Sequence, residues 1–569
     1  MPRTVPGGGG TATAPPHSEP SARRRSLPLR RSTVKRPLHR PVALVGALAA
    51  TLTLAACGSG DTAGAAAGPP QPGGTLRYGL SLAPTCSDPA QSQNNQTLYV
   101  TRQVVDSLTD QDPATGQIRP WLAESWFVSA DAKSFTFHLK EGITFSDGSP
   151  LTADSVRKNF DSILTLGAVK APQAASFLAG YTGSTVLDPR TVRVDFNAPN
   201  AQFLQASSTT QLGIQGDTTL AKSVDDRCLG GNIGSGPFTY AEWKQNASAT
   251  LAKRTGYRWG SALFANKGDA YLDKIVFTVV PESGVRTGSL SSGQLDAISD
   301  ALPQDAAQIE GAGGKVQFTS NPGVPFGLQP NLTRGPLRDP AVRAALLTAI
   351  NRKELVDTVL GPQFKSATSV LASATPGYLD LSARVKFDQA AARQVLDAAG
   401  WVPGADGIRV KDGQRLSFGV LFAAAFAGNQ AILELTQQQV RTVGIDLRLE
   451  PTSVAENTTR QNNKDYDVVY YNVSRADGDI LRQFAVNGRN LNARSETDKL
   501  DTLLTQQLEA TDTAARTRIL GEAQNAVLDD GLWIPTIELS QAIGVAGPVA
   551  DITFDASARL QFHDTWVRR

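Results

Sequence analysis

The segments LSFGVLF (416–422), NQAILELTQQQVRTV (429–443), IDLRL (445–449) and YDVVYY (466–471) decide the fold. Three of them are short apolar runs rich in residues that favour strands. The other repeats apolar residues at helical spacing and ends at Gly444, a residue type that commonly closes a helix. The order strand, helix, strand, strand predicts an α/β unit in this part of the chain.

The sequence on either side continues the mixture of strands and helices. Alternating or apolar runs predict strands at 75–80, 134–139, 186–196 (two strands around a turn at 188–190) and 533–538. Capping residues followed by apolar periodicity predict helices at 152–164, 339–350 and 388–400, and a pair of helices within 497–529. No repeat of solenoid length is present in the sequence. The fold class that we predict is therefore α/β throughout.

Residues 1–56 have the pattern of an export signal. Residues 1–40 carry nine basic residues and one acidic residue, and an uncharged apolar run follows from Val42 to Ala56. That run is shorter than the ~20 residues of a membrane span, as in a signal peptide. Cys57 directly follows small residues, so we predict a lipoprotein signal in which Cys57 carries the lipid. An ordinary signal peptide with a chance cysteine is the alternative, and the sequence leaves Sec and Tat export open.

The chain after the signal differs from it in charge and composition. Residues 57–72 are rich in Gly, Ala and Pro and predict a flexible linker. The signal carries a net formal charge of +8 and the whole chain +2, so the remainder is formally −6. No concentrated basic patch remains, and we expect no nucleic-acid partner. The residues after the signal suffice for two or three hydrophobic cores.

The sequence lacks the common catalytic and cofactor signatures. It has no nucleophile elbow, no phosphate-binding loop ending in Gly-Lys-Ser/Thr, and no helix with paired zinc-binding histidines. Of the four histidines, two lie in the signal and the others, His138 and His563, are far apart. We therefore expect no cofactor, no metal site and no catalytic residues, and predict a binding protein and not an enzyme.

Two cysteines follow Cys57, at Cys86 and Cys228. Outside the cytoplasm a lone pair of cysteines often forms a disulfide, which is our prediction. Two buried free thiols are the alternative, because a sequence does not show which cysteines are close in space.

Short motifs in a fixed order cover the chain from Gly73 to Arg569. They are GTLRYGL (74–80), DPA (88–90), PWLAESW (120–126), FHLKEGITFSDG (137–148), LTAD (151–154), GSGPF (234–238), YLD (271–273), SGQLD (292–296) and the run from Asp339 to Arg352. In this order and spacing, the sequence resembles the dipeptide/oligopeptide-binding proteins of ABC importers, solute-binding protein family 5. Most of these motifs are expected to be structural and not ligand contacts.

The resemblance implies a two-lobe periplasmic-binding-protein-like fold with an extra domain and a hinge between the lobes. The implied parts are lobe I (73–103, 206–318 and 531–569), the extra domain (104–205) and lobe II (319–530). A solute would lie between the lobes, and hinge closure would bury it. The implied partners are a membrane permease and its ATPase subunits. We expect a monomer held by its lipid on the outer face of the cell membrane.

The resemblance also suggests ligand-binding residues on the lobe I side. The segment after Asp88-Pro89 lines the cleft in family members, which points to Gln93, Asn94 and Asn95. Their amides both donate and accept hydrogen bonds, as peptide or polyol groups require. The alternative is that this segment is a solvated loop.

On the lobe II side, the resemblance suggests residues in the run that begins at Tyr466. The candidates are Tyr471, Asn472, Ser474, Arg475 and Asp477. Family peptide receptors carry a Trp and an anchoring Asp in this run, but Val473 and Ala476 occupy those positions here. Asp477 replaces that carboxylate only if the loop shifts by one residue.

Two of these candidates have structural alternatives. Arg475 either meets an anionic group of the solute or pairs internally with Asp477 or Asp479. Phe326 either forms an apolar wall of the cleft or packs in a core.

The predicted function is a substrate-binding lipoprotein that captures a small peptide or peptide-like solute for an ABC importer. The same kind of receptor for an oligosaccharide or a metal chelate is one alternative. An exported hydrolase is the alternative from a different class.

Overall fold

The computed structural model describes residues 69–92, 94–423 and 428–568. They belong to one compact unit, residues 67–569. The predicted signal peptide, Cys57 and Gln93 lie outside the described residues. Within the described ranges, no helix combines the length and apolar character that crossing a membrane requires.

The first sheet has seven strands in the order β12-β22-β11-β1-β10-β9-β8. Its strands are β1 (Thr75–Leu80), β8 (Phe238–Lys244), β9 (Ser248–Lys253), β10 (Lys274–Val279), β11 (Ala297–Ser299), β12 (Lys315–Ser320) and β22 (Ser540–Val545). Strand β1 is parallel to both neighbours, β10 and β11. The carboxyl ends of these parallel strands therefore meet at one edge of the sheet. The predicted strand 75–80 is confirmed as β1.

A four-stranded antiparallel sheet follows along the chain, in the order β4-β5-β7-β6. Its strands are β4 (Ala123–Val128), β5 (Ser134–Leu139), β6 (Tyr181–Asp188) and β7 (Thr191–Phe196). Helices α2 (Ala153–Lys170) and α3 (Pro172–Phe177) share its apolar core, in which Phe135 and Phe203 have ring centroids 5.0 Å apart. Helix α2 runs six residues beyond the predicted end at Leu164, with a kink where Gly167 has a φ of +64°.

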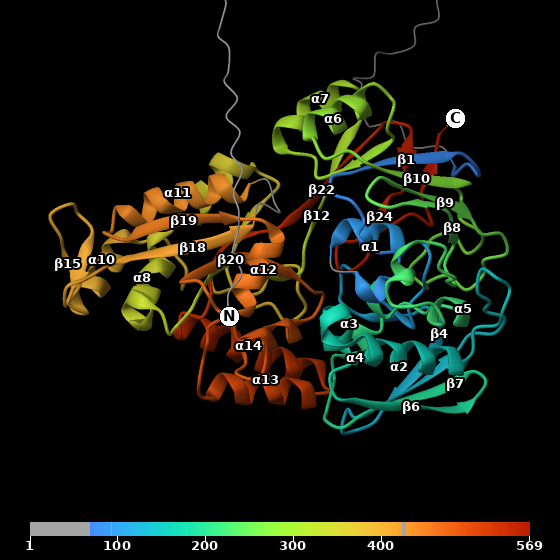
Figure 1. The fold of residues 1–569 in the computed structure, drawn as a ribbon, viewed down its shortest axis with the longest axis horizontal. Coiled ribbons are helices and arrows are strands. Elements are labelled where there is room, and N and C mark those ends of the chain that lie inside the picture. The colour runs from blue at the N-terminus through green and yellow to red at the C-terminus, as the bar shows by residue number, and fades with distance from the viewer. Residues whose placement is uncertain (1–68, 93, 424–427, 569) are drawn as a thin grey trace, which may run out of the picture. The chain divides into compact units, whose positions relative to one another are not determined.

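The second sheet has six strands in the order β14-β21-β13-β20-β18-β19. Its strands are β13 (Gly323–Pro330), β14 (Lys365–Ser366), β18 (Ser417–Ala423), β19 (Asp446–Thr452), β20 (Val468–Ser474) and β21 (Ile534–Glu538). Strand β18 is parallel to β19 and β20, with residues such as Phe418, Val420 and Val468 buried in the core. Figure 1 shows this sheet beside its covering helices α8, α10 and α11.

The predicted order strand, helix, strand, strand over 416–471 was wrong in one respect. A further helix, α12 (Val454–Asn462), lies between β19 and β20, so the order is β-α-β-α-β. This helix is short and polar, and only Asn457 and Gln461 are buried, so it has no apolar periodicity to recognise. Ser453 marks its start, because its side chain accepts a hydrogen bond from Glu456 N.

The chain crosses between the first and second sheets along two adjacent segments. The first crossing joins β12 to β13, and the second joins β21 to β22; Asn321 N donates to Leu539 O at 2.9 Å between them. The structure differs here from the predicted lobe boundary at residue 531. Strand β21 pairs with β13 and β14 of the second sheet, so the chain rejoins the first sheet only at Ser540.

The remaining elements complete these layers. The helices are α1 (Asn95–Thr101), α4 (Phe203–Ala206), α5 (Asp217–Leu220), α6 (Ser283–Ser291), α7 (Ala306–Gly311), α8 (Pro340–Ala349), α9 (Arg352–Leu355), α10 (Gln389–Ala398), α11 (Asn429–Arg441), α13 (Lys499–Glu509) and α14 (Thr513–Asp529). The remaining strands are β2 (Thr109–Gln111), β3 (Ile118–Pro120), β15 (Val402–Pro403), β16 (Arg409–Lys411), β17 (Gln414–Arg415), β23 (Val549–Ala550), β24 (Thr553–Phe554), β25 (Leu560–Gln561) and β26 (Trp566–Val567). Short 3₁₀ helices include η1 (Pro89–Gln91), η2 (Thr210–Leu212) and η7 (Gly478–Phe484).

Candidate functional site

The segment between β1 and α1 carries the first predicted ligand residues. Asn94 and Asn95 are both partly exposed at the start of α1. The Asn94 side chain accepts a hydrogen bond from Thr97 N at 2.8 Å and so caps this helix. Asn94 therefore has a structural role, while its amide nitrogen remains a donor that can serve a ligand.

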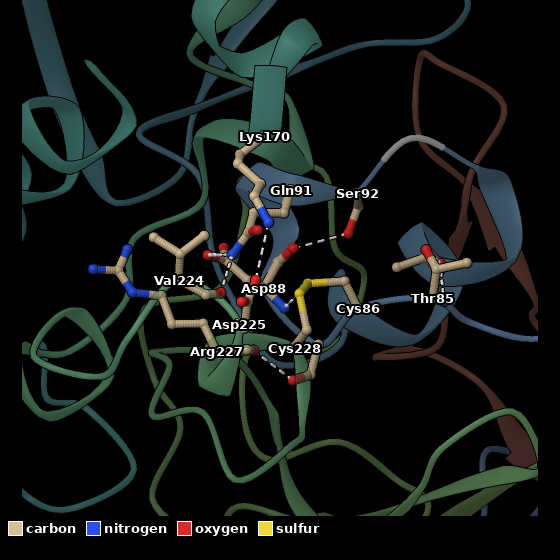
Figure 2. The surroundings of a disulfide bond; sticks show 12 residues. Thr85, Cys86, Asp88, Gln91, Ser92, Lys170, Val224, Asp225, Arg227 and Cys228 are labelled. Carbon is tan, nitrogen blue, oxygen red and sulfur yellow. Dashed lines mark hydrogen bonds and ion pairs between the residues drawn. A yellow bond between two sulfur atoms is a disulfide. The ribbon is translucent and has the colours of Figure 1, made fainter. Parts of the chain in front are cut away.

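A disulfide holds this segment in place. Cys86 and Cys228, which are 142 residues apart in the sequence, are joined by a disulfide with their Cα atoms 4.0 Å apart. Figure 2 shows the bond beside Asp88, whose backbone N–H contacts the Cys86 sulfur at 3.4 Å. The Asp88 side chain in turn accepts a hydrogen bond from Gln91 at 3.1 Å. The loop that leads to α1 is thus fixed both covalently and by hydrogen bonds.

The carboxyl end of β20 carries the predicted residues of the second sheet. Tyr471 donates a hydrogen bond to Gln329, is 3.0 Å from the Gln483 side-chain oxygen, and packs against Trp533 with ring centroids 5.1 Å apart. Burial raises its pKa to about 12. Ser474 accepts a hydrogen bond from Asn321 at 2.9 Å, next to the first crossing segment.

Two other predicted residues lie close to Tyr471. Asn472 is partly exposed on the same strand. Phe326 is buried in the core of the second sheet and stacks on Tyr470 with ring centroids 5.3 Å apart. Of the two interpretations of Phe326, its surroundings favour core packing.

After β20, a buried cluster pairs carboxylates with guanidinium groups. Arg475 lies 2.9 Å and Arg482 2.6 Å from oxygens of Asp479, which is fully buried. Asp477 accepts hydrogen bonds from Arg516 at 2.6 and 2.9 Å. We call these five residues the arginine–aspartate cluster. Arg475 therefore pairs internally with Asp479, one of the two partners considered for it.

Charge pairing dominates the electrostatics of this cluster. Burial alone would raise the pKa of Asp479, but the guanidinium groups of Arg475 and Arg482 offset that effect and hold the pKa far below its usual range. Asp477 also caps η7, because its carboxylate accepts a hydrogen bond from Asp479 N at 2.7 Å. A carboxylate already bound to Arg516 is a poor anchor for a ligand ammonium group, so Asp477 does not supply the expected substitute.

Arg475 also connects the second sheet to the four-stranded part of the molecule. Its guanidinium group donates to the Gln202 side chain and lies over the Phe177 ring, 4.8 Å from the centroid. Nearby, Gln111 donates to Ala476 O at 3.0 Å. These contacts hold the end of β20 against α3, the residue before α4 and the last residue of β2.

A cavity of about 190 Å³ lies beside these contacts. It is lined by residues 111–116, 373–376, Ala476 and Ala556. This volume is below the roughly 300–1,000 Å³ of a drug-sized ligand pocket. The cavity can therefore accommodate only a small part of a peptide-sized solute in this arrangement.

Sequence reasoning missed a polar group at the carboxyl edge of the first sheet. Asp300 follows β11 directly, and its carboxylate accepts hydrogen bonds from Ser81, which follows β1, and from Gln96 in α1 at 3.0 Å. Burial raises the pKa of Asp300, and the Ser81 hydrogen bond and the charge of Arg286 partly offset that rise. The sequence analysis predicted no strand at 297–299, and the partners of Asp300 lie more than 200 residues away in the sequence, so no local signal pointed to this group.

The two histidines of the described region have structural surroundings. His563 is buried, stacks on Phe264 with ring centroids 4.6 Å apart and contacts Gly268 O at 2.9 Å. His138 lies 2.9 Å from the Thr191 hydroxyl. In the described ranges, no group of three or more His, Cys, Asp or Glu residues is arranged to hold a metal ion.

Comparison with known proteins identifies relatives of the whole two-sheet unit. Residues 117–487 match the family described as "Bacterial extracellular solute-binding proteins, family 5 Middle". The probable D,D-dipeptide-binding periplasmic protein DdpA of Escherichia coli (strain K12) is 25% identical over 499 residues, which cover 84% of this chain and 91% of the relative.

Two solved structures share the fold. NikA from Brucella suis, in complex with Fe(III)-EDTA, has a TM-score of 0.76 at 24% identity, covering 87% of this chain and 100% of NikA. The oligopeptide-binding protein AppA from Bacillus subtilis, in complex with a nonapeptide, has a TM-score of 0.71 at 20% identity, covering 88% of this chain and 100% of AppA. The family match spans more than half of the chain, and the chain belongs to the bacterial extracellular solute-binding proteins, family 5.

Proposed function

We propose that this protein is the extracytoplasmic receptor of an ABC importer and captures a small peptide-like solute between its two large sheets. The observation that carries the proposal is the family match, which includes β20 and the loops after it. The relative named as a probable D,D-dipeptide-binding protein supports the peptide-like class of solute. The receptor would deliver the solute to a permease and its ATPase subunits.

The two crossing segments supply the hinge that this function needs. Both pass between the sheets close to Asn321 and Leu539, so few backbone angles would have to change for the sheets to move apart. Contacts such as Arg475 with Gln202 would stabilise the closed arrangement. A solute shifts the population toward that arrangement only if it binds the closed form more tightly than the open form.

The candidate ligand residues surround this closing region from both sides. Asn94 and Asn95 lie at the start of α1, and Asn472 and Ser474 at the end of β20, all four partly exposed, whereas Arg475 is buried and would have to leave Asp479 to meet a solute. The amide and hydroxyl groups of the four exposed residues suit the carbonyl and N–H groups of a peptide-like solute. We infer that the protein binds this solute without turning it over, and that it acts as a monomer.

Membrane attachment is a separate part of the proposal and rests on the sequence. Cys57 would carry the lipid after removal of residues 1–56, and residues 57–72 would tether the folded unit to the membrane surface. Cys57→Ser should leave the protein without lipid, with no effect on its fold. Mass spectrometry that finds an unmodified Cys57 in the wild-type protein would contradict the lipid anchor.

A second candidate is a receptor for an uncharged, hydroxyl-rich solute such as an oligosaccharide. Buried side-chain polar atoms of Gln205, Thr210 and Gln211 lack hydrogen-bond partners among the described residues, which favours this candidate. Gln211 lies 2.8 Å from Gln173 in α3, and Phe177 of the same helix contacts Arg475. Neutral donors and acceptors at this position match hydroxyl groups as well as amides.

A ligand screen on the mature chain carrying Cys57→Ser tests both candidates. We expect short peptides to raise the midpoint of thermal unfolding in a concentration-dependent way, because a ligand bound only to the folded state stabilises it. Oligosaccharides and nickel chelates serve as the competing classes. Stabilisation by one of these classes but by no peptide would reject the peptide-like proposal. Chemical conversion of any bound compound would show that the protein is an enzyme.

A further inference from the structure

Asp300 lies where ligands commonly bind in sheets with parallel strands. It directly follows β11, and Ser81 directly follows β1, which is parallel to β11. Ligands of α/β proteins usually bind beyond the carboxyl ends of such strands. Asp300 has a φ of +51°, in the left-handed region of the backbone map that residues other than glycine rarely adopt. Strained backbone of this kind is concentrated at functional positions.

The Asp300 carboxylate uses only one of its two oxygens for protein contacts. Ser81 Oγ and Gln96 Nε2 both donate to Oδ2. No donor from the described residues reaches Oδ1, and within those residues no ammonium or guanidinium group forms an ion pair with this side chain. Asp300 as a residue is partly exposed, and Oδ1 has capacity to accept further hydrogen bonds.

The nearby Arg286 does not neutralise this carboxylate by direct contact. Its guanidinium group donates to backbone oxygens at the ends of β10 and β11, namely those of Val280, Pro281, Ser299 and Asp300. Arg286 thus fixes the backbone beneath the carboxylate and leaves the carboxylate oxygens to other donors.

Gln96 contributes a second unsatisfied acceptor. Its orientation is fixed, because a carboxylate accepts only and the amide nitrogen must therefore face Asp300. Its Oε1 is then a buried acceptor without a partner among the described residues, on a side chain that is 4% exposed. A buried acceptor left unpaired is costly, so an incoming donor would be stabilised here.

This pair of acceptors lies next to the crossing segments. Tyr99, one turn of α1 after Gln96, donates to Gln541 at 3.0 Å. Gln541 is the second residue of β22, directly after the second crossing. Ala301 N also donates to Ala542 O at 3.0 Å. Figure 1 shows α1 close to β22, in agreement with the Tyr99–Gln541 hydrogen bond.

We propose that Asp300 and Gln96 form a subsite that binds a cationic amino or guanidinium group of the solute. The inference rests on the proposed receptor function and deepens it. An ammonium group offers several donors and a positive charge, which match a carboxylate and an amide oxygen that both accept. The arginine–aspartate cluster offers no such partner, because Asp477 and Asp479 are already paired with arginines.

Binding of peptide pools to the mature Cys57→Ser chain tests the subsite. The probes are a mixed tripeptide pool lacking Lys and Arg, the same pool N-acetylated, and an N-acetylated pool containing Lys. The parent chain is compared with the variant Asp300→Asn. This substitution removes the negative charge, and asparagine tolerates the left-handed backbone. The matched control is Asp412→Asn, since Asp412 has a φ of +50° but is exposed on the β16–β17 turn.

We expect the parent chain to prefer the free-amine pool to the acetylated pool by roughly 10- to 100-fold, the range for a hydrogen bond to a charged group. Asp300→Asn should remove this preference without lowering the unfolding midpoint, and Asp412→Asn should retain it. Restored binding of the acetylated pool containing Lys would assign the subsite to a side-chain cation, and its absence to the α-ammonium group.

Two results overturn the inference in distinguishable ways. Equal binding of all three pools by the parent chain, or a preference that survives in Asp300→Asn, rejects the subsite and leaves the receptor function standing. Binding of no pool by any variant rejects the peptide-like function, and the subsite falls with it.

Discussion

The edges of the two large sheets contain carboxylates in opposite electrostatic surroundings. At the second sheet, Asp479 is fully buried between Arg475 and Arg482, and its pKa is far below the usual range. At the first sheet, Asp300 is partly exposed, its hydrogen bonds come from the neutral groups of Ser81 and Gln96, and burial raises its pKa.

This difference separates a structural use of charge from one that is available for binding. The arginine–aspartate cluster fixes the loop after β20, and a ligand would have to displace an arginine to reach its carboxylates. Asp300 has no such competitor among the described residues. The family resemblance suggested an ammonium anchor at the second sheet. The accessible carboxylate, Asp300, lies instead at the first sheet.

The largest expected effect concerns the disulfide that fixes the first-sheet side. Replacing both Cys86 and Cys228 with Ser should lower the free energy of unfolding by about 3–5 kcal/mol, because the closed loop of 142 residues no longer restricts the unfolded chain. Denaturant titration measures the loss. Wild-type protein with a reductant should approach the same midpoint; an unchanged midpoint in the double variant would contradict the role of the bond.

The next effect tests the structural role of the arginine–aspartate cluster. Asp479→Ala should lower the free energy of unfolding by about 3–5 kcal/mol, because it leaves Arg475 and Arg482 buried without their partner. The control is Asp465→Ala, which removes an exposed pair with Arg334 and should cost less than about 1 kcal/mol. Similar losses in the two variants would refute the distinction.

The pH dependence of stability should have opposite signs at the two edges. Because the folded-state pKa of Asp479 is depressed, its contribution is complete above its unfolded pKa of about 4 and is lost as the pH falls below that value. The raised pKa of Asp300 has the reverse effect, since folding becomes more favourable as the pH falls toward about 4. Unfolding titrations from pH 7 to pH 3 compare each variant with wild type. Asp479→Asn should remove the loss of stability at low pH, and Asp300→Asn should remove the opposite trend.

The smallest effect is expected for Asp300→Asn at neutral pH. The substitution removes a charge that burial disfavours and keeps an acceptor for Ser81 and Gln96, so the free energy of unfolding should rise by up to about 1 kcal/mol or stay unchanged. Thermal and denaturant unfolding both measure this. A loss of more than about 2 kcal/mol would show that Asp300 is a structural residue like Asp479.

Much of the fold could be predicted because its signals are local. The alternation in SFTFHL predicts β5, and Asp339-Pro340 predicts the start of α8, since a cap and a Pro at the first helical position act over a few residues. Helix α12 was missed because its surface is polar. The sequence also did not show that β21, which lies after the predicted boundary at residue 531, pairs with β13 of the second sheet.

The candidate site was less predictable because its contacts join residues that are distant in the sequence. The sequence suggested Arg475 and Asp477 together, but it did not indicate that Arg516, 39 residues further on, holds Asp477. It likewise did not bring Asp300 to Ser81, from which it is separated by 219 residues.

By itself, the sequence determined the family, the order of most elements and the expected export signal, because composition, periodicity and motif spacing are properties of neighbouring residues. Only the tertiary structure decided which carboxylates are neutralised and which remains available. The reason is physical: a carboxylate takes its charge partners and burial from side chains that folding brings within a few ångströms, whatever their separation along the chain.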